Sequence, residues 1–534
     1  MTKPKVLVAD PIAQRGIDEL AAGGLLDVTV KLGLKPDELL AIIGDFEALV
    51  VRSETKATAA VIEAAHKLRV IGRAGVGVDN VDVDAATRRG IIVMNTPGGN
   101  TISTAEHAFS LMVSTARNIP QADASVKGGK WDRKTFVGVE LYNKTLAILG
   151  MGRIGTEIAR RAIAFGMRVV AYDPYLSPSR ARSLQVELIE KLDDIIPQAD
   201  FITMHMPLTA ETKHMLNAER LAKAKKGVRI VNCARGGLID EAALLEALKT
   251  KHVAAAALDV FEQEPPPADH PLLGLDEVIV TPHLGASTTE AQEGVAFTVA
   301  EQMRDYLLSG ALRGAVNVPA LGAKELALLQ PYLALAEGLG RVQAQLVDSA
   351  VREVRIDFAG ELVDVDAAPI TRAFLAGLLR DVSARVNVVN AFLIAEERRI
   401  AVTTSYVRST DAPPAIRTRI VSESGEQTVA GTVFAAAGGN RQGRITEIND
   451  FRIEAIPHGH MLVMHNRDVP GVIGRIGTIL GDRGINISEF HLGRRERGGE
   501  AMAVIEIDAG AGEETLDGLR ALKDILMVRE IKLA

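Results

Sequence analysis

The segment 145–155 constrains the fold more than any other part of the chain. A short apolar run of buried-strand type is followed by Gly150, Gly152 and Gly155 in the spacing G-x-G-x-x-G. In this spacing the first glycine permits a tight turn, the second lets the backbone approach a pyrophosphate, and the third lets a helix pack closely on the strand. A helical pattern follows from 157 to 165, and a helix N-terminus favours phosphate. The segment therefore predicts a dinucleotide-binding unit rather than a glycine-rich turn without a ligand.

Asp173 indicates which dinucleotide binds. It ends a second strand-like run, 168–172, at roughly the 20-residue spacing where an acid meets the adenosine ribose. A carboxylate at this point accepts hydrogen bonds from the ribose hydroxyls and repels a 2′-phosphate. We therefore expect NAD rather than NADP as the cofactor.

The composition excludes several classes of protein. The chain has 534 residues, which suggests about three or four domains, and its net charge of −7 argues against a nucleic-acid partner. An anionic substrate would therefore need a local basic pocket. Cys233 is the only cysteine, which rules out an internal disulfide and fits a reducing, cytoplasmic compartment. We find no signal-peptide pattern and no apolar run of the ~18 residues that a membrane span needs, so no membrane partner is expected.

Short apolar runs alternate with helical patterns over residues 1–285, which predicts α/β structure with parallel sheets. Residues 101–119 are predicted as one helix, with Ser103 and Thr104 as N-terminal caps. A long helical pattern runs from Thr288 to Leu308.

The C-terminal part of the chain divides into two segments. Residues 317–452 show a helical pattern at 323–350, then mixed strands and helices and a glycine-rich loop at 435–440, with no motif that indicates chemistry. From about residue 459 the predicted order is βαββαβ, which is typical of a ferredoxin-like module.

Three polar residues follow predicted strands of the nucleotide-binding segment: Arg235, Glu264 and His283. Ligands of open parallel sheets lie at the carboxyl ends of the strands, so these side chains are candidates for catalysis. The spacing alone leaves open that Arg235 belongs to a solvated turn and Glu264 to loop surface. For the same reason, three loops of the first segment are candidates for substrate contacts: 52–56, 72–80 and 95–100.

These motifs resemble the D-isomer-specific 2-hydroxyacid dehydrogenases, and in particular their long members that act on 3-phosphoglycerate. The matching stretches are 51–53, 72–79, 94–97, 128–131, 149–155, 232–236 and 282–288 with Gln292. The resemblance implies a flavodoxin-like substrate domain, an inserted doubly wound Rossmann-type NAD domain, an intervening α+β domain and a C-terminal ferredoxin-like ACT domain. Their expected bounds are 1–98 with 286–316, 99–285, 317–452 and 459–534.

The resemblance assigns roles to the three candidates. His283 would take the proton of the C2 hydroxyl as hydride leaves C2, and histidine suits this because it titrates near neutral pH. Glu264 would bond the other ring nitrogen, and Arg235 would hold the substrate carboxylate or C2 oxygen.

The resemblance also implies the ligand contacts. Cofactor contacts are expected at Gly150, Gly152, Arg153, Ile154, Gly155, Asp173, Cys233, Ala234, Arg235, Asp259, His283, Gly285 and Ala286. Substrate contacts are expected at Arg52, Ser53, Arg73, Val76, Asn100, Arg133 and Gln292, with Arg133 and Lys134 acting on the phosphate across a subunit interface.

In the last module the resemblance implies an amino-acid effector site at Asn466, Asp468 and Asn486. Relatives often carry a larger His or Tyr where Asn466 stands. The alternative is a dimerisation module without a ligand.

The resemblance implies oxidation of 3-phospho-D-glycerate to 3-phosphohydroxypyruvate, the first step of L-serine synthesis, with serine as feedback inhibitor and a homotetramer as the assembly. Two alternatives stay open. One is a dehydrogenase for another D-2-hydroxy acid, such as glycerate or glyoxylate. The other is an NAD-sensing corepressor-like scaffold without substantial turnover.

Overall fold

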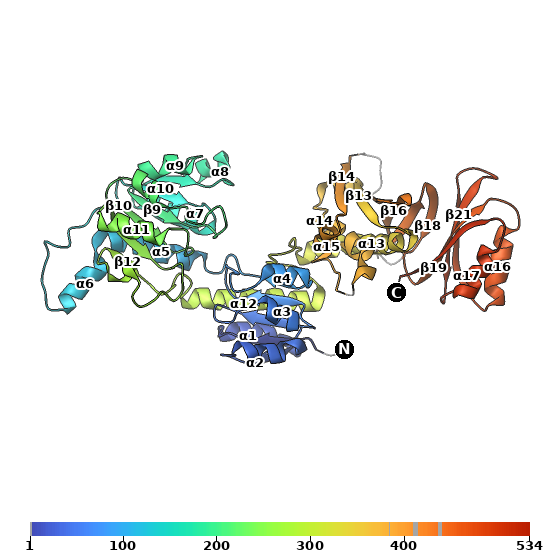
Figure 1. Cartoon of the computed structure of the whole chain (residues 1–534), viewed down its shortest axis with the longest axis horizontal. Coiled ribbons are helices and arrows are strands. Elements are labelled where there is room, and N and C mark those ends of the chain that lie inside the picture. The colour runs from blue at the N-terminus through green and yellow to red at the C-terminus, as the bar shows by residue number, and fades with distance from the viewer. Residues whose placement is uncertain (1–2, 384, 409–414, 436–440, 534) are drawn as a thin grey trace.

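The computed structural model describes residues 3–383, 385–408, 415–435 and 441–533. The chain forms four units, each built on one sheet, in an elongated row (Figure 1). The glycine-rich loop expected at 435–440 lies, apart from Ala435, outside the described residues. None of the described helices is both long enough and apolar enough to cross a membrane.

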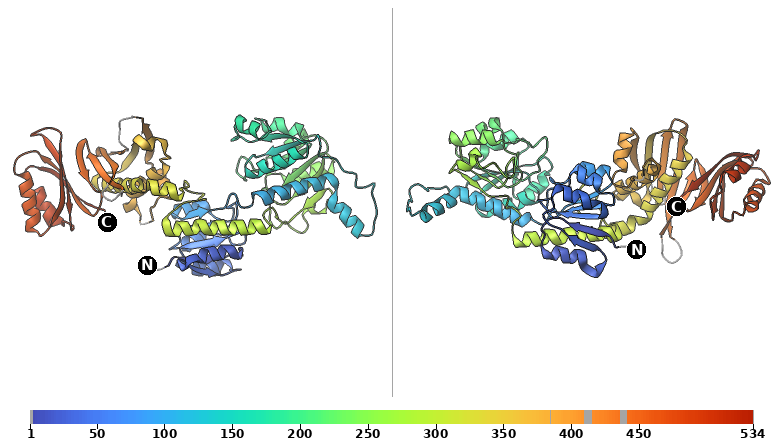
Figure 2. Two further views of the ribbon diagram at one scale, coloured as in Figure 1. Left: turned by 180° about the vertical axis from the view of Figure 1, so that it is seen from behind. Right: turned by 60° about the horizontal axis from the view of Figure 1, so that its bottom comes forward.

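The first unit is a parallel sheet in the order β2-β1-β3-β4-β5, which is the flavodoxin-like order. The long helix α12 (Thr289–Ser309) returns to this sheet and lies beside α1 (Figure 2). Val299 and Met303 of α12 pack against Gly72, where no Cβ would fit. The other elements of the unit are β1 (Lys5–Val8), α1 (Gln14–Ala21), β2 (Asp27–Val30), α2 (Pro36–Ile42), β3 (Ala48–Val51), α3 (Ala59–Ala64), β4 (Val70–Arg73), α4 (Val83–Arg88) and β5 (Ile92–Met94).

The second unit is a seven-stranded parallel sheet in the order β12-β11-β10-β9-β6-β7-β8. The order reverses between β6 and β9, as in doubly wound dinucleotide-binding folds. The strands are β6 (Thr145–Leu149), β7 (Arg168–Tyr172), β8 (Glu187–Leu188), β9 (Phe201–Met204), β10 (Val228–Asn232), β11 (Val253–Leu258) and β12 (Val278–Val280).

Helices cover both faces of this second sheet, because its strands are apolar on both sides. One buried cluster joins the sheet to α5 and α7, and a second joins the other face to α9, α10 and α11. The helices are α5 (Thr101–Arg117), α6 (Ile119–Lys127), α7 (Arg153–Ala164), α8 (Pro178–Ser183), α9 (Leu192–Ile195), α10 (Ala218–Lys223) and α11 (Glu241–Lys249).

The helix predicted at 101–119 differs from the observed one in two ways. Asn118 adopts a left-handed conformation with φ of 51° and separates α5 from α6. Asn100, not Ser103 or Thr104, is the residue at the N-cap of α5. The capping prediction was wrong because both hydroxyls bond to a distant segment instead.

The third unit is a mixed sheet in the order β14-β13-β15-β16-β17-β18, covered by the long helix α13 and by α14. Only the β13–β14 pair is parallel. Its elements are α13 (Ala323–Leu346), β13 (Val351–Ala359), α14 (Ala368–Leu378), α15 (Ala391–Glu397), β14 (Ala401–Val407), β15 (Ala415–Ser422), β16 (Gly425–Ala435), β17 (Arg441–Ile448) and β18 (Phe451–Ala455).

The fourth unit is a four-stranded antiparallel sheet in the order β20-β21-β19-β22 with two helices packed on it. This is the ferredoxin-like order that the βαββαβ pattern predicts. The elements are β19 (His460–Arg467), α16 (Val472–Asp482), β20 (Ile487–Arg494), β21 (Glu500–Ile507), α17 (Glu513–Arg520) and β22 (Ile525–Lys532). The predicted α/β fold class is thus confirmed.

Candidate active site

The glycine turn after β6 has the geometry that its spacing predicts. Gly150 has φ of 96°, a conformation that L side chains rarely adopt. A Cβ on Gly155 would collide with the carbonyl of Gly150, so only glycine lets α7 approach the strand this closely. At Gly152 an added Cβ would meet no heavy atom within 4 Å. Open space therefore lies at the N-terminus of α7, where a phosphate can approach the backbone.

The helix α7 begins at Arg153, four residues earlier than the pattern predicts. Arg153 and Ile154 therefore occupy its first turn, directly after the N-cap Gly152. The earlier start brings the free N–H groups of the helix to the glycine turn itself.

Asp173 lies at the end of β7 and connects two turns. One carboxylate oxygen accepts the N–H of Met151 at 2.8 Å, and the other accepts the N–H of Tyr175 at 2.8 Å. The side chain thereby fixes the glycine turn, and each oxygen keeps a further lone pair for a ribose hydroxyl. Together with the space at Gly152, this donor and acceptor set fits NAD.

Residues 232–235 form a tight turn after β10. Asn232 accepts the N–H of Ala234 at 3.0 Å and donates to the carbonyl of Arg235 at 2.8 Å. Cys233 is buried, and burial raises the pKa of its thiol well above the ordinary value. The thiol therefore stays protonated and packs as a small apolar side chain.

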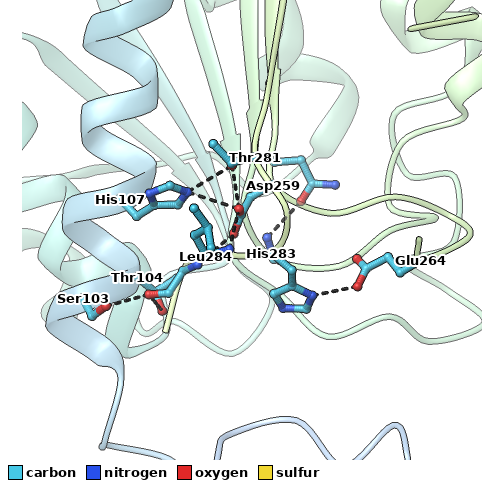
Figure 3. A network of polar contacts seen from close by, with 11 residues as sticks. Ser103, Thr104, His107, Asp259, Glu264, Thr281, His283 and Leu284 are labelled. Atoms are coloured by element: carbon cyan, nitrogen blue, oxygen red, sulfur yellow. Dashed lines mark hydrogen bonds and ion pairs between the residues drawn. The ribbon is translucent and has the colours of Figure 1, made fainter. Parts of the chain in front are cut away.

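His283 and Glu264 form a direct pair. His283 Nδ1 lies 2.7 Å from Glu264 Oε2 (Figure 3). The second oxygen of Glu264 accepts the N–H of Phe261 at 3.2 Å. The bond to Glu264 raises the pKa of His283 against the opposing effect of burial. Burial alone would raise the pKa of Glu264, but the bond from His283 lowers it. The pair thus favours a charged imidazole beside a charged carboxylate.

A pocket of about 360 Å³ borders this pair. Its walls include Phe261, Leu273, Val280 and Pro282, so one side of the His283–Glu264 pair faces largely apolar groups.

Arg235 links the second unit to the first. Its Nε donates to Asp79 Oδ2 at 3.1 Å, and its Nη1 donates to the carbonyl of Ala234 at 2.6 Å. Its positive charge partly offsets the rise in the pKa of His283 that the bond to Glu264 causes, and it adds to the lowering of the pKa of Arg73 that burial causes. Arg235 therefore stands between the histidine pair and the loops of the first sheet.

Asp10, which the sequence patterns did not single out, organises the loop after β3. It is 1% exposed and accepts the N–H groups of Arg52, Glu54 and Thr55 at 2.6 to 3.2 Å. The loop that carries Arg52 and Ser53 is therefore held at the carboxyl end of the sheet by a buried carboxylate.

Arg73 completes a basic cluster with Arg52 and Arg235. Its Nε donates to the carbonyl of Arg52 at 3.0 Å. Burial and the charges of Arg235 and Arg52 lower its pKa to about 10, and Asp79 opposes them. Three guanidinium groups thus lie near one exposed acid, and such a cluster attracts an anionic ligand.

The remaining predicted substrate residues divide into two groups. Val76 lies in the loop beside this cluster, and its carbonyl accepts from Asn95 at 2.5 Å. Asn100 has a buried side-chain oxygen without a hydrogen-bond partner among the described residues, and Gln292 lies in the first turn of α12. Arg133 and Lys134 differ, because they lie on an exposed segment that projects outward after α6 (Figure 1).

A second network supports the turn that carries His283 and includes His107, which the sequence patterns missed. Asp259 is buried and accepts from Thr281, Leu284 and Gly285, while Ser103 and Thr104 donate to the carbonyl of Gly285 (Figure 3). Burial alone would raise the pKa of Asp259, but hydrogen bonds, first that of His107, lower it. Ala286 follows this turn and is half-buried.

The predicted effector residues lie in the fourth unit. Asp468 accepts from Arg494 and from the N–H of Gly498, each at 3.1 Å, and the bond from Gly498 chiefly lowers its pKa. Asn486 donates to Asp508 at 2.8 Å. Asn466 is 3% exposed, and its side-chain oxygen has no partner among the described residues.

Three sequence-family models match the chain. The NAD binding domain of the D-isomer specific 2-hydroxyacid dehydrogenases matches residues 109–285. The D-3-phosphoglycerate dehydrogenase intervening domain matches 328–449, and the ACT domain matches 460–525.

Individual proteins extend this likeness. D-3-phosphoglycerate dehydrogenase of Methanocaldococcus jannaschii is 46% identical over 99% of this chain and 100% of its own length. That of Bacillus subtilis is 44% identical over 99% of both chains. The crystal structure of Aquifex aeolicus D-lactate dehydrogenase, complexed with NAD and lactic acid, is 25% identical and covers 59% of this chain and 100% of that one, with a TM-score of 0.53.

Proposed function

The chain belongs to the family of the D-3-phosphoglycerate dehydrogenases, and we propose that it oxidises 3-phospho-D-glycerate to 3-phosphohydroxypyruvate with NAD, in L-serine biosynthesis. The observation that carries this proposal is the His283–Glu264 pair beside a cluster of three arginines. A pair of this kind suits proton transfer at a hydroxyl, and the cluster suits a substrate with both a carboxylate and a phosphate.

His283 acts as the general base. Because Glu264 occupies Nδ1, Nε2 is the ring nitrogen that takes the proton of the C2 hydroxyl. The bound nicotinamide supplies the acceptor for the hydride that leaves C2. As the hydroxyl loses H⁺ and C2 loses H⁻, the C2–O bond becomes a carbonyl, and Glu264 stabilises the imidazolium that forms. In the reverse direction His283 returns the proton.

The arginines orient the substrate. Arg235 binds the carboxylate or the C2 oxygen, and Arg52 and Arg73 bind the phosphate through charge-assisted hydrogen bonds. The side-chain oxygen of Asn100, which has no partner among the residues that the structure describes, accepts a hydrogen bond from a substrate hydroxyl. Ser53, Val76 and Gln292 line the same site, and Arg133 of a second subunit contributes across the interface.

The test is turnover of a substrate panel. We would measure NADH formation from 3-phosphoglycerate, glycerate, lactate and 2-hydroxyglutarate, and NADH consumption with the corresponding keto acids. We expect the phosphorylated pair to give the highest kcat/KM. Preference for an unphosphorylated acid would identify another D-2-hydroxyacid dehydrogenase. NADH binding without turnover in either direction would overturn the enzymatic role and favour a scaffold.

We propose that L-serine inhibits the enzyme by binding at Asn466, Asp468 and Asn486, and that the cytoplasmic protein is a homotetramer. The buried side-chain oxygen of Asn466, which has no hydrogen-bond partner in the described part of the chain, supports a ligand at this position. The matching ACT domain supports a regulatory role. Inhibition by serine in the presence of 3-phosphoglycerate, and the mass in solution, test these two points.

A further inference from the structure

Helix α5 presents three polar side chains to the turn that carries His283. Ser103 and Thr104 lie four and three residues before His107, so both neighbour His107 on the helix surface (Figure 3). Ser103 Oγ donates to the carbonyl of Gly285 at 2.7 Å, and Thr104 Oγ1 donates to the same carbonyl at 3.1 Å. A single backbone acceptor thus receives two hydroxyl groups from a segment about 180 positions away in the chain.

His107 acts on the same turn through Asp259. Its Nε2 lies 3.2 Å from Asp259 Oδ1 and 3.2 Å from Thr281 Oγ1. Thr281 Oγ1 donates onward to Asp259 Oδ1 at 2.6 Å, so His107 is placed as a donor to both oxygens. The side chain of Asp259 is fully buried, and its ionised form needs these donors.

Asp259 in turn holds the backbone on both sides of His283. Its carboxylate accepts the N–H of Leu284 at 2.7 Å and of Gly285 at 2.9 Å, and its backbone carbonyl accepts the N–H of His283 at 2.9 Å. Each residue from 283 to 285 therefore donates its N–H to Asp259.

The turn needs this support because His283 has φ of 56°. A residue other than glycine rarely adopts this left-handed conformation unless contacts with the surrounding structure hold it there. The imidazole projects from this backbone towards Glu264, so a relaxation of the turn would move the ring relative to its partner (Figure 3).

We infer that Ser103, Thr104 and His107 are positioning residues that hold His283 in its reactive orientation through Asp259 and the carbonyl of Gly285. Their hydrogen bonds among the described residues go to Gly285, Thr281 and Asp259, not to the imidazole or Glu264. This inference depends on the proposed function only because the activity test uses 3-phosphoglycerate as the substrate.

The test compares variants of α5 in the full chain. Ser103→Ala/Thr104→Val removes both donors to Gly285, and His107→Leu removes the donor to Asp259. His107→Gln keeps an N–H donor in the same region. Thr115→Val is the matched control. Thr115 is buried in the same helix, and its hydroxyl donates to the carbonyl of Met112 at 2.8 Å, not to the turn that carries His283.

We expect the double variant and His107→Leu to lower kcat by about 10- to 100-fold, the cost of a misplacement of roughly 1 Å. The KM for 3-phosphoglycerate should stay within about threefold, because the variants leave Arg52, Arg73 and Arg235 unchanged. The isotope effect with C2-deuterated substrate should rise, and His107→Gln should recover most of kcat. Equal losses in Thr115→Val, or no better activity in His107→Gln than in His107→Leu, would overturn the inference.

A readout without substrate separates this inference from the proposed function. The imidazole signal of His283 in ¹⁵N-histidine NMR spectra, assigned with His283→Gln, should shift or broaden in the double variant and stay unchanged in Thr115→Val. An unchanged signal in the double variant would contradict the positioning role. If the wild type turns over no substrate, the proposed function fails, and this signal alone decides the inference.

Discussion

Arg235 donates to Asp79 at 3.1 Å, and this bond joins a turn of the nucleotide-binding sheet to a loop of the first sheet. Asp79 is 68% exposed, while Arg235 is 28% exposed and lies near Arg52 and Arg73. The acid is thus a solvent-accessible counter-ion for a basic cluster that an anionic substrate has to enter.

Removal of this counter-ion should strengthen anion binding. In Asp79→Asn we expect the inhibition constant of sulfate against 3-phosphoglycerate to fall by about two- to fivefold at low salt, in the range of an exposed ion pair. The effect should disappear at about 0.5 M salt, because exposed charges are screened there. Weaker sulfate binding in the variant would show that Asp79 chiefly orients Arg235.

The His283–Glu264 pair predicts a shift in the pH profile. Glu264 raises the pKa of His283, and oxidation needs the neutral imidazole, so activity should fall as pH decreases through that pKa. In Glu264→Gln the pKa of His283 falls, so the acid limb for oxidation should move to lower pH. Reduction needs the protonated imidazole, so its rate falls as pH rises through the pKa of His283. In Glu264→Gln this fall should occur at lower pH than in the wild type. We also expect kcat to fall on the order of tenfold.

The matched control for this profile is Glu262→Gln. Glu262 is a neighbouring carboxylate that contacts His214 at 3.1 Å instead. Its replacement should leave both limbs in place, and a shift of the same size would mean that general electrostatics, not the direct bond, sets the profile.

Gly152 and Gly155 should respond differently to alanine. At Gly152 there is open space, so Gly152→Ala should keep the melting temperature but weaken NADH binding by occupying the approach of the pyrophosphate. In Gly155→Ala the new Cβ collides with the Gly150 carbonyl. We therefore expect weaker NADH binding and, in addition, a free energy of unfolding lower by about 1–3 kcal/mol. Thermal unfolding and NADH titration distinguish the two, and equal losses of stability would contradict the assignment of open space.

Asp173 should control the choice of cofactor. Asp173→Ala should weaken NADH binding by about 10- to 100-fold, the range for a hydrogen bond to a charged group, and should narrow the preference over NADPH. Because the carboxylate also holds the N–H of Met151, Asp173→Asn should retain more of the turn while losing the charge. Fluorescence titrations with both cofactors measure this, and an unchanged ratio in Asp173→Asn would remove the ribose assignment.

Asn486 should determine the response to serine. Asn486→Ala removes the amide that bonds to Asp508, far from the glycine turn, so we expect serine inhibition to be lost while kcat and KM without serine stay unchanged. Retained inhibition in this variant would place the effector elsewhere.

The sequence predicted the parts of the site that depend on local pattern. The glycine turn, Asp173 and the three residues after strands lie where strand–helix alternation places them, because a parallel sheet collects strand ends at one edge. Asp10 and His107 were missed, because their partners lie far along the chain and no local spacing marks them. Ser103 and Thr104 show the same limit, since a hydroxyl near a helix start predicts a cap unless a distant carbonyl competes for it.

Asp10 and Asp259 are equivalent in one respect: each is 1% exposed and holds one loop of the site by accepting backbone N–H groups. One belongs to the first sheet and the other to the second. The hydrogen bonds that hold each half of the site therefore lie within that half's own unit. If the first and second units moved apart, the bond between Arg235 and Asp79 would break, but the loops held by Asp10 and Asp259 would keep their hydrogen bonds. Substrate and product could then exchange while His283 and Arg52 keep their positions for the next turnover.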